Sequence, residues 1–215
     1  MTPQQVEEFY RRLASAGPAP KTELRYINPY TLLVAVVLSA QATDVGVNKA
    51  TGPLFARITT PQQMVDLGED RLKEAIRTIG LYQTKAKNVI ALSKILVENY
   101  QGQIPATREE LEALPGVGRK TANVVLNVAF GQPTIAVDTH IFRVGNRTGL
   151  SVGGNVREVE DELLRVTPEQ WRMDAHHHLI LFGRYTCKAR NPACEACPVQ
   201  DLCQDYATRQ ATASA

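Results

Sequence analysis

Apolar residues recur at helical spacing along most of the chain, and the strict alternation typical of half-buried strands is absent. The first twenty residues form an amphipathic stretch in which one helix face carries Val6, Phe9, Tyr10 and Leu13. N-cap signals indicate helix starts at Thr60–Pro61, Thr107 with Glu110, Asn155 with Glu158, and Thr167–Pro168. Glycines indicate helix ends at Gly80, Gly102 and Gly131. The pattern predicts an all-α fold.

The run from Thr31 to Ala40 is the one segment that also suits a buried strand, because it is rich in β-branched residues. No second strand of similar quality is available to pair with it, so we expect a buried helix. Its apolar core, Leu32 to Leu38, is too short to span a bilayer. Beyond about Thr208 the composition predicts a disordered tail.

A short amphipathic helix, a Pro-Gly-Val-Gly turn and a second helix, Thr121 to Phe130, are predicted around residues 111–130. Pro115 ends the first helix, while Gly116 and Gly118 can take positive φ and leave backbone N–H groups uncovered. Such a turn at a helix start suits a phosphate group. An ordinary tight turn between helices is the alternative; the adjoining Arg119-Lys120 pair favours phosphate.

Lys120 and Asp138 are candidates for chemistry, one as a nucleophile and the other as a carboxylate that can stabilise positive charge. Lys120 falls in the first turn of its helix, where the helix dipole and partial burial are expected to lower the pKa of the amine and make it a nucleophile. A solvated lysine or a phosphate contact is the alternative. Asp138 is predicted first as an N-cap, a position in which it stays ionised and could also stabilise a developing positive charge.

Four cysteines lie close together in the order Cys187-x6-Cys194-x2-Cys197-x5-Cys203. This grouping favours one metal centre over a disulfide framework, and both a zinc ion and a [4Fe–4S] cluster fit the four thiolates. The first interval and its upstream flank carry the basic residues Arg184, Lys188 and Arg190. These side chains are candidates for contacts to a phosphate backbone; a purely structural clip with incidental charge is the alternative. Residues 176–178, three consecutive histidines, point in different directions on a helix and are expected as mixed surface and packing residues.

Composition adds little to this interpretation. The 215 residues carry a formal net charge of +2, so nucleic-acid binding cannot be argued from charge alone. The N-terminal stretch lacks the pattern of a signal peptide, and with the clustered cysteines this predicts a cytoplasmic protein without a membrane segment.

The motif Leu-Pro-Gly-Val-Gly-Arg-Lys at residues 114–120 resembles the helix-hairpin-helix of the DNA glycosylase superfamily that includes the endonuclease III family. The Val-Asp-Thr-His context of Asp138 and the cysteine spacing are similar as well, and the resemblance runs from about residue 20 to 203. It implies a six-helix barrel domain with the hairpin at residues 22–132. Residues 1–21 and 133–215 would form a [4Fe–4S] cluster domain, with a DNA cleft between the two.

The resemblance also implies a function: removal of oxidised pyrimidines from duplex DNA and nicking of abasic sites by a monomer. Lys120 would attack C1′, assisted by Asp138, and the resulting Schiff base would lead to β-elimination. Further DNA-contact candidates by likeness are Gln41 and Leu81 as wedges and Asp44 as a support; for Leu81, which follows a helix-ending glycine, inward packing is the ordinary alternative. Lys85, near a helix start, is a candidate phosphate contact with a solvated lysine as the alternative, and Gly116, Gly118 and Arg119 of the hairpin are candidates for phosphate. Three alternatives stay open: an adenine glycosylase, which Lys120 argues against, a non-catalytic iron–sulfur protein that binds DNA, and a zinc-clipped helical protein.

Overall fold

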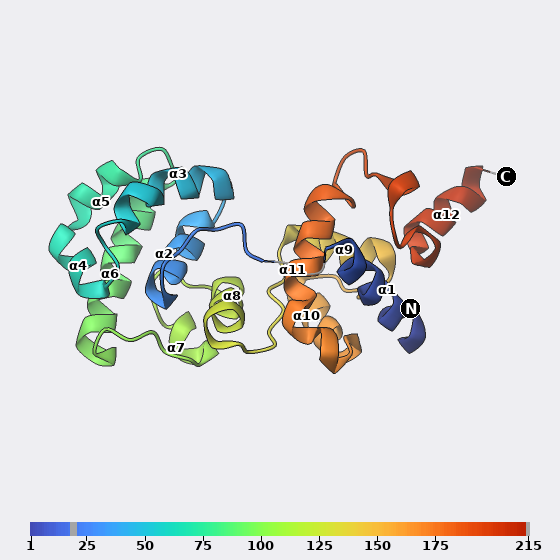
Figure 1. The fold of residues 1–215 in the computed structure, drawn as a ribbon, viewed down its shortest axis with the longest axis horizontal. Coiled ribbons are helices and arrows are strands. Elements are labelled where there is room, and N and C mark those ends of the chain that lie inside the picture. Colours follow the sequence, from blue (N-terminus) through green and yellow to red (C-terminus); the bar gives the residue numbers. More distant parts are fainter. Residues whose placement is uncertain (18–20, 214–215) are drawn as a thin grey trace. The chain divides into compact units, whose positions relative to one another are not determined.

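The computed structural model describes residues 1–17 and 21–213, and every regular element within them is helical (Figure 1). The prediction of an all-α fold is confirmed. The chain divides into two compact units, Thr22–Gln132 and Met1–Lys21 with Pro133–Ala215. The second unit therefore joins the first residues of the chain to its last eighty or so, and the described helices include none that is long and apolar enough to cross a membrane.

The unit Thr22–Gln132 is built around one helix that is buried on all sides. Its helices are α2 Pro29–Ser39, α3 Asp44–Phe55, α4 Pro61–Leu67, α5 Glu69–Ala75, α6 Tyr82–Tyr100, α7 Arg108–Glu112 and α8 Arg119–Phe130. Helix α2 packs against α3, α6 and α8, and each of its residues from Tyr30 to Leu38 is buried. A helix surrounded in this way is apolar around its whole circumference, which is why its sequence also resembled a strand.

The start of α2 is fixed by a local signal. The Asn28 side chain accepts a hydrogen bond from the backbone N–H of Thr31 at 2.9 Å, and the Thr31 hydroxyl accepts one from the N–H of Asn28 at 3.0 Å. Pro29 stands between them in the first helical turn, where its missing N–H costs nothing. The helical interpretation of residues 31–40 is thus confirmed, and this capping box also decides where the helix begins.

The other unit comprises α1 Pro3–Ala16, α9 Thr139–Thr148, α10 Val156–Val166, α11 Glu169–Tyr185, the short 3₁₀ turns η1 Cys194–Ala196 and η2 Gln200–Leu202, and α12 Gln204–Ala213. Helix α1 carries its predicted apolar face, including Phe9 and Tyr10, into a core shared with α9, α10 and α11. Phe9 meets Phe182 edge to face with ring centroids 6.0 Å apart, so the N-terminal helix is tied to the helix that leads into the cysteines.

Four local predictions need correction. Helix α11 begins at Glu169 after Pro168, without a side-chain cap, because the Thr167 hydroxyl bonds the Tyr10 hydroxyl at 2.9 Å instead. Gly80 does not end α5, which stops at Ala75, but precedes the start of α6. Residues 176–178 are all buried rather than partly at the surface. The predicted disordered tail is helical as far as Ala213, since α12 continues from the last cysteine; residues 214–215 lie outside the described part of the chain.

Candidate DNA-repair site and iron–sulfur centre

The predicted hairpin is formed by α7, a turn at residues 113–118, and α8. Buried side chains on both sides of the turn, Leu111, Leu114 and Val117, anchor it to the core. The backbone N–H of Val117 donates to the Leu114 carbonyl at 3.1 Å, which closes the turn before α8 begins. Gly118 is the N-cap of α8 and no side chain caps this helix end. The positive end of the α8 dipole is therefore not covered by a capping side chain, which is the arrangement that suits a phosphate.

The two glycines of the turn have different roles. Gly116 has φ +78°, and a Cβ atom there would lie 3.0 Å from Cβ and Nδ2 of Asn88, so both its conformation and its surroundings require glycine. Gly118 has φ −97°, so the prediction of positive φ is wrong for this residue. A Cβ atom at Gly118 would meet nothing within 4 Å, which leaves the space before the helix start open to an incoming group.

Both residues that follow Gly118 lie in the first turn of α8 and are half-buried. Arg119 forms a long ion pair with Glu112, with 3.9 Å between Nη1 and Oε1, so its guanidinium is held over the hairpin. Lys120 comes next in the same turn, near the positive end of the helix dipole, a location that disfavours the charged form of an amine.

Asp138 is the N-cap of α9, as its sequence context predicts. One carboxylate oxygen, Oδ1, accepts hydrogen bonds from the N–H groups of His140 at 2.8 Å and Ile141 at 2.9 Å. The other, Oδ2, lies 3.3 Å from His140 Nδ1. The side chain is 19% exposed. Capping thus fixes the orientation of a carboxylate that keeps partial access to its surroundings, which makes the two predicted roles compatible.

The two proposed wedge residues occupy neighbouring loops, and both have left-handed backbones. Gln41 has φ +54° in the connection from α2 to α3, and Leu81 has φ +60° immediately before α6. A Cβ atom on Gly80 would lie 3.9 Å from the Gln41 carbonyl oxygen, so the loops are adjacent. Leu81 is 63% exposed although it is large and apolar. An inward-packed Leu81, the ordinary alternative, is therefore wrong.

Lys85 does not fit a phosphate contact. Its side chain is buried, and Nζ donates to the Leu38 carbonyl at 3.0 Å. Burial lowers the pKa of this amine. Lys85 instead ties α6 to the last turn of α2, directly before the loop that carries Gln41. Asp44 lies at the start of α3, where a carboxylate is stabilised by the helix dipole.

All four cysteines line one pocket together with Arg147, Tyr206 and Arg209. Burial raises the pKa of the Cys197 and Cys203 thiols, and the other cysteines contribute in the same direction. Thiols in such a setting bind as thiolates only when a metal centre supplies compensating positive charge.

The donor set fits an iron–sulfur cluster, because four thiols line one pocket. A [4Fe–4S] cluster places each thiolate on a different iron, so it suits cysteines that surround a volume rather than a point. Cys187, Cys194, Cys197 and Cys203 would be the ligands.

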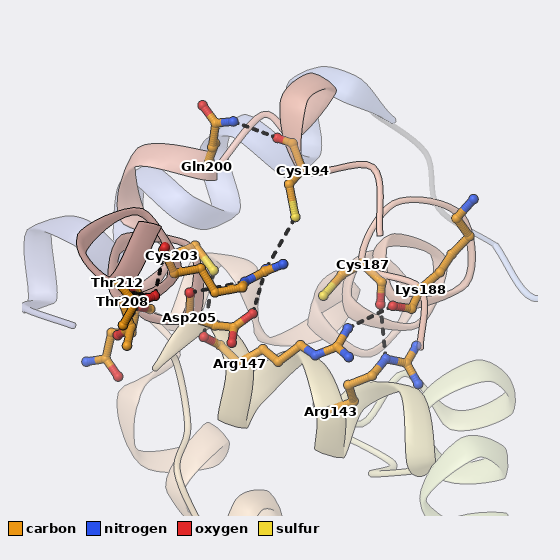
Figure 2. A network of polar contacts seen from close by, with 12 residues as sticks. Arg143, Arg147, Cys187, Lys188, Cys194, Gln200, Cys203, Asp205, Thr208 and Thr212 are labelled. Carbon is orange, nitrogen blue, oxygen red and sulfur yellow. Dashed lines mark hydrogen bonds and ion pairs between the residues drawn. The ribbon is translucent and has the colours of Figure 1, made fainter. Parts of the chain in front are cut away.

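The loop that follows Cys187 is held by two arginines from one face of α9 (Figure 2). Arg143 donates to the Cys187 carbonyl at 3.0 Å, and Arg147 donates to the carbonyls of Lys188 at 2.7 Å and Ala189 at 3.1 Å. With its backbone fixed, the loop leaves the side chains of Lys188 and Arg190 exposed. Arg184, one helical turn earlier, is half-buried.

Sequence reasoning missed Arg143, Arg147 and Arg209. The spacing of Arg143 and Arg147, four residues apart on an amphipathic helix, was the available signal that both face one side. Their binding partners could not be predicted from the sequence, because the acceptors are backbone carbonyls, which every residue carries. Arg209 fell in the segment expected to be disordered.

Comparisons with known proteins identify the family. The model of the HhH-GPD superfamily, base excision DNA repair proteins, matches residues 34–169, and the iron–sulfur binding domain of endonuclease III matches residues 187–203. Endonuclease III of Haemophilus influenzae is 58% identical over 197 residues, which is 92% of this chain and 93% of that protein. The chain belongs to the endonuclease III family.

Other relatives agree with this assignment. Endonuclease III of Escherichia coli K12 is 57% identical over the same shares of the two chains. Among solved structures, a trapped covalent intermediate of endonuclease III with DNA matches with a TM-score of 0.91 and 45% identity, covering 98% of this chain and 99% of that chain. Membership of this family makes the chain a base excision repair DNA glycosylase with lyase activity at abasic sites, whose partner is DNA and whose cofactor is a [4Fe–4S] cluster.

Proposed function

We propose that this endonuclease III family member removes oxidised or ring-saturated pyrimidines from duplex DNA and nicks the resulting abasic site through a Schiff base on Lys120. The observation that carries the proposal is the hairpin: an uncapped helix start at Gly118, open space before it, and Lys120 two residues further on. The hairpin would hold the phosphate backbone while the lysine reaches the sugar.

In the proposed reaction the neutral amine of Lys120 attacks C1′, and the bond from C1′ to the damaged base breaks, so the base departs with the bonding electrons. Ring opening then gives an iminium between lysine and sugar. Loss of a proton from C2′ expels the 3′ phosphate, and water releases the lysine. Asp138, whose Oδ1 is committed to capping α9, would stabilise the positive charge that builds on the sugar through its other oxygen.

Access to the base requires that the nucleotide leave the stack, at a cost of a few kcal/mol. Leu81 is the proposed wedge, because its exposed side chain and left-handed backbone direct an apolar group outward from a rigid loop. Gln41 on the adjacent loop is proposed to occupy the vacated space. Lys188, Arg190, Arg184 and Arg119 are proposed as contacts to the backbone, and Asp44 as a support.

The proposal is tested with a duplex carrying one thymine glycol, incubated with holoenzyme in the presence and absence of borohydride. Wild-type protein should nick the strand and give a covalent adduct on reduction. Lys120→Gln should give neither, while Lys73→Gln should behave as wild type, because Lys73 is paired with Glu69 at 2.7 Å on α5. Full trapping by Lys120→Gln would overturn the assignment of the nucleophile. DNA binding by wild-type protein without nick or adduct would favour a non-catalytic DNA-binding protein.

We further infer that the two compact units are two functional domains, Thr22–Gln132 with the hairpin and Met1–Lys21 with Pro133–Ala215 holding the cluster. The protein is proposed to act as a monomer in the bacterial cytoplasm, on nucleoid DNA. Sedimentation at increasing concentration tests the monomer: a mass that rises above 23.7 kDa in steps would contradict it.

A further inference from the structure

One cation makes a direct contact to a cysteine sulfur in the cluster pocket. Arg209, on α12, donates from Nη2 to Sγ of Cys194 at 3.5 Å, and its guanidinium is one of the groups that line the pocket. Figure 2 shows this contact as a dashed line from the Cys194 sulfur to a guanidinium that lies beside Asp205. The other basic side chains of this region, Arg143 and Arg147, bind backbone carbonyls instead.

Arg209 is held in this position by its own helix. Its Nη2 also donates to Oδ2 of Asp205 at 2.6 Å, one helical turn earlier, and its Nε donates to the Asp205 carbonyl at 3.3 Å. Helix α12 in turn packs on α9, where Gln204 lies so close to Gly149 that any side chain at position 149 would collide with it. The guanidinium is therefore directed at Cys194 by packing and by an i,i+4 ion pair.

Cys194 has a second, independent tether. Its carbonyl accepts a hydrogen bond from Nε2 of Gln200 at 2.9 Å, and its position in η1 is closed by the bond from the Cys197 N–H to the same carbonyl at 3.1 Å. Loss of Arg209 would thus leave the backbone of Cys194 in place and remove only the donor to its sulfur.

Hydrogen bonds to ligating sulfurs draw electron density from the thiolate, and a nearby cation favours the more negative, reduced state of a cluster. Both effects raise a reduction potential. We propose that Arg209 is a positioning residue of the iron–sulfur centre, which acts through Cys194 to raise the cluster potential and to shield this sulfur from solvent. The [4Fe–4S] cluster supplies the redox couple, and Arg209 sets its potential without being a ligand.

The test compares the cluster potential of purified holoenzyme variants by mediated redox titration, followed in the visible absorption of the cluster. Arg209→Gln should shift the potential to more negative values and should lose cluster absorbance faster under a chelator. Arg165→Gln is the matched control, because Arg165 makes a similar ion pair with Glu162 at 2.6 Å on α10 and has no sulfur contact. Its potential should equal that of wild type.

Arg209→Lys separates charge from hydrogen-bond geometry and guards against a folding failure of the glutamine variant. The lysine variant retains a positive charge but lacks the planar guanidinium with its fixed donors. Its cluster potential should therefore lie between those of wild type and Arg209→Gln. The proposal would be overturned if the cluster potential of Arg209→Gln equals that of wild type and of Arg165→Gln. If Arg209→Gln loses its cluster on purification, the same comparison is made with Arg209→Lys. DNA nicking is recorded alongside, but the potential decides.

Discussion

Replacement of Gly116 by alanine should destabilise the hairpin by a predictable amount. The left-handed backbone at φ +78° costs an L side chain about 1 to 2 kcal/mol. The new Cβ would stand 3.0 Å from Asn88 Cβ, a crowding that adds about 1 kcal/mol. Alanine also lowers the conformational entropy of the unfolded chain relative to glycine, which stabilises the folded protein by about 0.5 kcal/mol. The net loss is about 2 kcal/mol, or roughly 4 to 8 °C in Tm for a chain of this size.

Gly118→Ala is the matched control, and it should separate stability from DNA binding. Its φ of −97° suits alanine, and the new Cβ would meet nothing within 4 Å, so Tm should stay equal or rise slightly. Affinity for a duplex with an abasic-site analogue should fall, because the methyl group would fill the space proposed for phosphate.

The assay is thermal unfolding of holoenzyme followed by circular dichroism, with fluorescence anisotropy for DNA binding and visible absorbance to verify that the cluster is intact. Asn88→Ala combined with Gly116→Ala should recover only the part of the crowding that comes from the Asn88 amide group, a coupling below about 1 kcal/mol, because alanine keeps the Cβ atom. Equal stability of the two alanine variants would refute the strain argument. Unchanged DNA affinity in Gly118→Ala would refute the role of the open helix start.

Three further predictions concern other parts of the chain. Leu81→Asn should keep or raise stability, since asparagine tolerates φ +60°, while excision of a base from duplex DNA falls. Burial lowers the pKa of His177 and His178 below 6.5, so the folded protein favours their neutral forms. The urea midpoint of unfolding should therefore fall as pH drops below about 6.5, and it should fall less in the double variant His177→Gln/His178→Gln. Burial also lowers the pKa of Lys85, so the free energy of unfolding should rise as pH approaches 10.5. Lys85→Met should remove this dependence on pH.

Each of these has a contrary outcome. Wild-type excision by Leu81→Asn would remove that residue from the wedge assignment. An acid slope that is identical in wild type and in the double histidine variant would assign the acid sensitivity to groups other than these two histidines. An unchanged alkaline slope in Lys85→Met would mean that its amine ionises as freely in the folded state as in the unfolded one.

The elements that could be predicted from the sequence are those governed by local chemistry. Asp138 was identified as an N-cap because its carboxylate bonds N–H groups only two and three residues away. The hairpin could be located because Pro115 ends the preceding helix and Gly116 permits the left-handed backbone of the turn, both within a few residues. The group of four cysteines could be located because the thiols recur within one short segment.

The predictions that failed depend on partners distant in sequence. Lys85, near a helix start, was expected to contact phosphate or solvent, whereas its partner is a backbone carbonyl 47 residues earlier. Thr167 does not cap α11, because its hydroxyl bonds the hydroxyl of Tyr10, which is 157 residues away in the sequence. Helix α12 was missed because its polar composition is typical of disorder, while its order follows from packing on α9 and from its position directly after Cys203.

The strain in the loops of Gln41 and Leu81 is itself an argument for function. Gln41 and Leu81, on two adjacent loops, both have left-handed backbones, which together cost about 2 to 4 kcal/mol. A glycine at either position would avoid its share of this cost. Leu81 also exposes an apolar side chain that burial would stabilise. The buried bond from Lys85 to the end of α2 offsets part of this cost by fixing one loop. The left-handed backbones of Gln41 and Leu81 therefore support the DNA contacts that we propose for these two side chains.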